Sequence, residues 1–78
     1  MSRFVPLSDL PVGGRGIVVA LDAKPALAAR LTALGFLPAT EVRCRRRAPF
    51  GDPRVYELRG SQLCLRRSEA RSVLVELA

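Results

Sequence analysis

The chain has 78 residues, 49% of them apolar and 26% charged, which is the composition of one small globular domain and not of a disordered chain. A domain of this length holds one thin core and leaves little room for an enclosed active site. The net charge is +6, and twelve of the thirteen basic residues are arginine, which favours nucleic acid, an anionic membrane face or an acidic protein surface as partner, although solubility alone explains it equally well.

The first half of the chain predicts a helical turn, a glycine turn, a strand and a helix. Residues 7–11 form the turn, with Ser8 or Asp9 as its cap. The glycines of residues 12–16 indicate a turn with positive φ and not a phosphate-binding loop, because the β-branched strand 17–21 follows them where such a loop requires a helix.

One helix is predicted over residues 25–34. Pro25 suits its first position, and Gly35 suits the left-handed position that ends it. Leu27, Leu31 and Leu34 recur at helical spacing and form the face expected to enter the core.

The second half of the chain predicts four more short strands. Alternation within strand 41–47 places Val42 and Cys44 toward the core. The turn-rich segment 48–53 leads to a strand in which Tyr56 and Leu58 share one face. The remaining segments are an antiparallel strand 61–66, with Leu63 and Leu65 facing inward, a helical turn 68–71 capped by Ser68, and a last strand 73–77. The fold class is therefore mainly β: one domain over residues 1–78, a small barrel of about five strands whose closure removes free sheet edges.

Three motifs, in this order and spacing, resemble the FeoA family, the ferrous iron transport protein A group. They are Leu-Gly-x-x-Pro at 34–38, Ala-Pro-x-Gly-Asp-Pro at 48–53, and Arg-Gly-x-x-Leu-x-Leu-Arg at 59–66, within a match from about Val5 to Leu77. The resemblance implies an SH3-like barrel and a stand-alone cytosolic accessory to FeoB, the large membrane ferrous iron transporter with a GTP-binding domain. The family is linked to transition metal ion binding.

The sequence departs from the family pattern at three positions. Ala39 stands where the family has glycine, which predicts a type I turn or mild strain. Ser61 replaces a frequent aromatic residue, and Cys64 replaces a small serine or alanine. The first two changes alter the surface that a partner would meet.

Metal binding and catalysis are not expected from the residue types present. The chain has no histidine, and Cys44 and Cys64 are far apart on opposite predicted strand faces. Its seven acidic residues are scattered, so no base accompanies Tyr56 or either cysteine. We therefore expect no cofactor, no metal site and no enzyme activity.

The candidate partner-binding residues are of two kinds. Phe36, Leu37 and Phe50 are large apolar residues in turns, where they form either an interface or plugs of the barrel ends, and Leu37 favours the interface. Arg43, Arg45 and Arg47 are predicted to project from one face of strand 41–47 as a stripe, which either steers a partner or is merely solvated.

These residues favour a regulatory module that binds the cytosolic part of a FeoB-type transporter. The alternative is a nucleic-acid-binding barrel, although Tyr56, the aromatic residue within the strands, is predicted to face inward and so offers no stacking platform. An iron chaperone is a third reading, and self-association stays open. No apolar run reaches the length of a membrane span and no signal peptide is evident, so a cytoplasmic location is expected.

Overall fold

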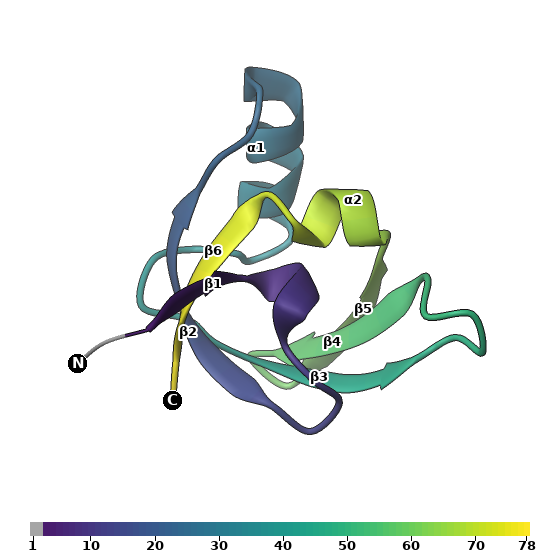
Figure 1. Cartoon of the computed structure of the whole chain (residues 1–78). Coiled ribbons are helices and arrows are strands. Elements are labelled where there is room, and N and C mark those ends of the chain that lie inside the picture. Colours follow the sequence, from purple (N-terminus) through teal and green to yellow (C-terminus); the bar gives the residue numbers. More distant parts are fainter. Residues whose placement is uncertain (1–2) are drawn as a thin grey trace.

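The computed structural model describes residues 3–78 as one curved antiparallel sheet with three short helical segments (Figure 1). The strands are β1 (Phe4–Pro6), β2 (Arg15–Leu21), β3 (Glu41–Arg47), β4 (Arg54–Leu58), β5 (Ser61–Leu65) and β6 (Val73–Leu77). The helical segments are η1 (Leu7–Asp9), α1 (Pro25–Ala33) and α2 (Arg67–Ala70). The strand order is β1-β6-β2-β3-β4-β5, with every neighbouring pair antiparallel.

The mainly β prediction is confirmed, but two details of it are wrong. The sheet has six strands, because β1 pairs with β6 in a three-residue ladder too short to show alternation in the sequence. The sheet also does not close: β1 and β5 are its outer strands, and no ladder joins them within the described residues. The helical segments that follow these two strands, η1 and α2, contact each other instead.

Helix α1 follows its local signals closely. Pro25 occupies the first turn, and Gly35 follows the helix with φ +108. A Cβ atom at Gly35 would lie 2.8 Å from Leu58 Cδ1, so glycine is required there by packing as well as by φ. Leu31 is fully buried, whereas Leu34 is 38% exposed, so the predicted leucine face enters the core only in part.

The predicted caps of the short helical segments are wrong. Pro6 precedes η1, and Ser8 lies buried within it. Arg66, not Ser68, precedes α2, and its backbone N–H donates to Glu69 Oε1 at 2.9 Å. The Glu69 carboxylate therefore satisfies a free N–H at the start of α2 without a serine cap.

One core fills the concave side of the sheet, as the alternation in β3 and β4 predicted. Val42, Cys44 and Tyr56 are fully buried, and Leu58 and Leu65 nearly so. Cys64, the neighbour of Leu65, is exposed. Cysteine and tyrosine thus serve as packing residues in a chain with few large aromatics.

Ala39 adopts a backbone conformation that favours glycine. Its φ is +72, and the Thr40 N–H donates to the Leu37 carbonyl at 3.1 Å, which closes a turn with Pro38 and Ala39 at its centre. Positive φ at the second central residue defines a type II turn. The predicted type I turn is therefore wrong, and the predicted mild strain is confirmed.

We expect Ala39→Gly to stabilise the protein by about 0.5–1 kcal/mol, because relief of the left-handed alanine exceeds the entropy that glycine adds to the unfolded chain. Urea unfolding measures the change. Ala33→Gly, in the last turn of α1, is the matched control and should destabilise by a similar amount. If Ala39→Gly destabilised the protein as Ala33→Gly does, the strain at Ala39 would be contradicted.

A candidate docking surface at the β3–β4 turn

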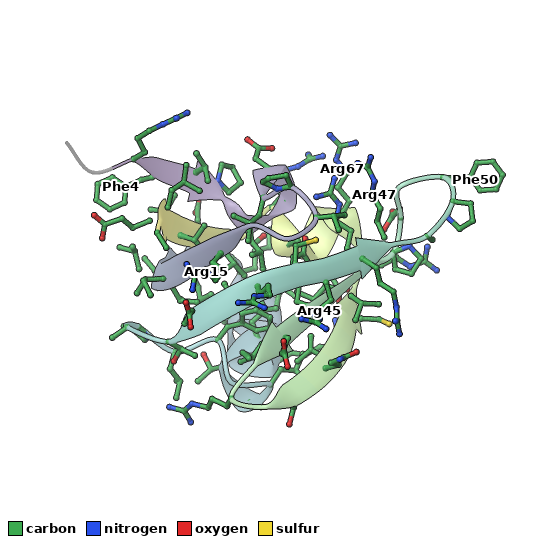
Figure 2. All side chains as sticks on the ribbon, turned by 90° about the horizontal axis from the view of Figure 1, so that it is seen from below. Phe4, Arg15, Arg45, Arg47, Phe50 and Arg67 are labelled. Carbon is green, nitrogen blue, oxygen red and sulfur yellow. The ribbon has the colours of Figure 1, made fainter. Side chains whose placement is uncertain are left out.

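The turn between β3 and β4 projects away from the sheet, from α1 and from both termini (Figure 1). Backbone hydrogen bonds close it: the Gly51 N–H donates to the Ala48 carbonyl at 2.7 Å, and the Ala48 N–H donates to the Pro53 carbonyl at 2.9 Å. Phe50 lies at its tip and is 98% exposed, with its ring directed into solvent (Figure 2). The alternative prediction, that Phe50 plugs an end of the barrel, is therefore wrong.

Phe36 has the opposite environment from Phe50. It is fully buried, and its backbone N–H donates to the Leu31 carbonyl at 3.1 Å, which holds the chain after Gly35 against the end of α1. The prediction that Phe36 lies on a partner surface is therefore wrong, because it is a core residue. Leu37 is half-buried in the separate turn between α1 and β3.

A β-bulge at Arg45 changes the direction of the arginines of β3. Cys44 pairs with Tyr56, but the next pair is Arg46 with Val55, so Arg45 is an extra residue in the strand. Arg47 then pairs with the inward-facing Arg54. A bulge shifts the alternation of faces by one residue. The predicted stripe is therefore wrong: Arg45 and Arg47 lie on different sides of β3 (Figure 2).

Arg43 and Arg45 remain together on the outer face of the sheet, where acidic residues accompany them. Arg43 lies opposite Arg15 of β2 and Glu57 of β4. Arg45 Nη1 lies 3.6 Å from Glu57 Oε1, and Arg15 forms a similar pair with Glu41 at 3.7 Å. These exposed pairs contribute little to stability, and they lower the net charge of this face.

Arg47 instead joins a group of arginines at the base of the Phe50 turn. Arg46 and Arg47 end β3, and Arg67 begins α2. The Arg67 backbone N–H donates to Asp52 Oδ1 at 2.9 Å, which ties α2 to the turn. All three arginines are exposed. Arg46 pairs with Val55 and therefore lies on the other side of β3 from Arg47. We call Phe50, Arg47 and Arg67 the Phe50 surface.

Arg54 lies beneath this surface and was not among the predicted site residues. It is 9% exposed, and its Nη1 donates to the Leu10 carbonyl at 3.0 Å. Its Nε is buried and has no partner. The alternation that predicted Tyr56 and Leu58 to face inward also places Arg54, two residues earlier, on the same face, so the sequence did contain this signal.

Tyr56 and Cys44 adjoin Arg54 in the core. Burial and, to a smaller extent, the neighbouring Cys44 raise the pKa of Tyr56 to about 12, while Arg54 opposes the shift. Burial likewise raises the pKa of the Cys44 thiol, against the charges of Arg54 and Arg47. Both groups are therefore neutral at physiological pH and serve the core as uncharged residues.

We expect stability to be constant up to about pH 9, where the unfolded chain begins to release the Cys44 proton, and to fall more steeply between pH 10 and 12. The sign follows because the folded pKa of Tyr56 lies above its ordinary value of 10.0, so the folded state holds the proton that the unfolded state releases. Urea unfolding across this range measures the loss. Tyr56 is the one tyrosine of the chain, so the absorbance of tyrosinate reports its ionisation directly. A midpoint near pH 10 in the folded protein would contradict its burial.

A surface hollow lies elsewhere, between the turn before β3 and the β4–β5 turn. It measures about 570 Å³, is open to solvent, and is lined by Pro38, Ala39, Thr40, Glu41, Arg59 and Gly60. Its one carboxylate, Glu41, already pairs with Arg15, and no nucleophile with a base lines it. Across residues 3–78, no three side chains of the metal-ligating types gather into a site.

Comparison with known proteins decides the family. The FeoA domain model matches residues 5–77, almost the whole chain. The chain belongs to the FeoA family. The match includes the Phe50 turn and the strands on both sides of it.

Solved FeoA structures share this fold. The FeoA-like protein of Clostridium acetobutylicum superposes with a TM-score of 0.90 at 30% identity, covering 99% of this chain and 90% of that one. FeoA of Chlorobium tepidum superposes with a TM-score of 0.86 at 36% identity, covering 94% of this chain and 70% of that one. FeoA of Stenotrophomonas maltophilia, a zinc complex described as a prokaryotic SH3 domain protein, gives 0.79 at 34% identity, with 96% and 88% covered.

The family match confirms the resemblance and the SH3-like fold class. FeoA proteins are associated with ferrous iron transport and are not a known enzyme family. No curated protein sequence matches the chain. Among the described residues, no helix has the length and apolar character needed to cross a membrane.

Proposed function

We propose that this FeoA protein is a cytoplasmic accessory of ferrous iron uptake that binds the cytosolic part of a FeoB-type transporter through the Phe50 surface. The observation that carries the proposal is Phe50, a phenylalanine 98% exposed at the tip of a hydrogen-bonded turn. An exposed aromatic ring on a hydrogen-bonded turn favours a partner that offers an apolar pocket.

The arginines beside Phe50 would act on the rate and orientation of binding. Arg47 and Arg67 lie at the base of the turn on the same side of β3 (Figure 2), where they would attract an acidic protein surface. Arg43 and Arg45 are proposed to add long-range attraction from the outer face. Leu37, in a different turn, is proposed as a second contact for a partner large enough to reach both turns.

Binding would act by shifting a conformational equilibrium of the transporter. An accessory protein changes such an equilibrium only if it binds one state more tightly than the other. No reactive group of this chain is needed for that effect, which accords with the neutral, buried Cys44 and Tyr56.

The test is a calorimetric titration of the full chain against the purified cytosolic region of the transporter. We expect a dissociation constant of about 10 μM or tighter, the range of regulatory interactions between small interfaces. Absence of binding at about ten times that concentration would reject the proposal. A structure of the complex with Phe50 outside the interface would reject its site.

Nucleic acid is the second candidate, favoured by the arginines of the Phe50 surface. A gel shift at increasing salt discriminates, because phosphate contacts make affinity fall steeply with salt. Tyr56 is fully buried and cannot stack on a base, which weighs against this candidate.

A further inference from the structure

Arg54 is a buried cation without an anionic partner. It is 9% exposed, and none of the ion pairs among residues 3–78 includes it. Its Nη1 donates to the neutral Leu10 carbonyl at 3.0 Å, its guanidinium also meets the neutral side chains of Cys44 and Tyr56, and its Nε has no acceptor. A buried guanidinium of this kind is costly unless a negative charge balances it.

A second cation lies directly opposite Arg54. The bulge at Arg45 brings Arg47 into register with Arg54 across β3 and β4. Like charges in directly paired positions destabilise a sheet. The bulge therefore places Arg47, and not Arg46, on the same side of the sheet as Arg54.

Arg67 adds a third cation at the same place. Its backbone N–H is bonded to Asp52 Oδ1, two residues before Arg54, and its side chain lies on the same side of β3 as that of Arg47 (Figure 2). Asp52 is the one carboxylate tied to this group by a hydrogen bond. Three cations against one carboxylate leave two positive charges unbalanced.

We infer that Arg47, Arg54 and Arg67 form a binding site for a phosphate group. Arg47 and Arg67 are exposed and present their guanidinium donors to the ligand, while Arg54 supplies its charge from beneath. Guanidinium groups match the oxygens of phosphate in pairs, and a phosphate dianion equals the unbalanced charge. The site does not depend on the proposed function, since binding of inorganic phosphate involves no contact with the transporter.

The test is calorimetric titration of the full chain with inorganic phosphate, in buffers of equal ionic strength that contain chloride or acetate. Replacing the buried Arg54 would endanger folding. The test therefore uses a double variant of the two exposed residues, Arg47→Gln with Arg67→Gln. The matched control is Arg15→Gln with Arg45→Gln, which removes the same charge from the outer face. Each charge-assisted hydrogen bond lost should weaken phosphate binding about tenfold.

A second arm identifies the source of the phosphate group. The same variants are sedimented with phosphatidic acid vesicles, whose headgroup is a phosphate monoester, and with neutral phosphatidylcholine vesicles. If the protein sediments with the anionic vesicles and only the double substitution of Arg47 and Arg67 abolishes this, the ligand is a lipid headgroup. If the protein binds inorganic phosphate but not the vesicles, the ligand is the free ion. Equal binding by both double variants, or no preference for phosphate over acetate, would overturn the site.

Discussion

Phe36→Ala is expected to remove a large part of the stability of the protein. Phe36 is fully buried against the end of α1, so alanine loses its transfer free energy and leaves a cavity, together about 3–5 kcal/mol. A domain of this size has a total stability of about 4–12 kcal/mol at the usual value per residue. Urea unfolding followed by circular dichroism measures the loss.

Phe36→Leu separates burial from a specific role of the ring. It retains most of the apolar volume and should cost about 1–2 kcal/mol while keeping a cooperative transition. If Phe36→Ala unfolded at the same urea concentration as the wild type, Phe36 would be a surface residue after all, as the sequence alone suggested.

Phe50→Ala is expected to weaken transporter binding about 30-fold or more without changing stability. A central aromatic contact typically contributes 2 kcal/mol or more to an interface. Its ring is 98% exposed, so the folded state loses no packing when it is removed. The same calorimetric titration and urea unfolding measure the two quantities.

Phe4→Ala is the matched control for Phe50→Ala. Phe4 is 55% exposed, and it lies at the opposite end of the molecule from Phe50 (Figure 2). The dissociation constant of the Phe4→Ala variant for the transporter should stay within about twofold of that of the wild type. Equal weakening by both substitutions would show that exposed apolar area, and not the Phe50 surface, drives the binding.

The helix and most strands could be predicted because their signals are local. Pro25 and Gly35 mark the two ends of α1, and the alternation of Val42 with Cys44 marks the buried face of β3. Strand β1 has only three residues, and the open sheet depends on how distant strands meet. Neither feature leaves a periodic pattern in the sequence.

The candidate site was predicted in part, and its errors have physical causes. Phe36 and Phe50 both follow turn residues, and only tertiary packing at Gly35 decides that one enters the core. The direction of Arg47 depends on the bulge at Arg45, which is defined by the partner strand and not by the residue types of β3. Arg54 was overlooked, although its spacing from Tyr56 indicated an inward side chain.

The outer position of β5 has a consequence for contacts between copies. Alternate N–H and C=O groups of an outer strand have no ladder partner, and they invite a further strand. If two copies paired antiparallel about Leu63, Arg59 of each would face Arg67 of the other, and like charges would push the copies apart. The arginines that flank β5 thus disfavour this pairing between identical chains.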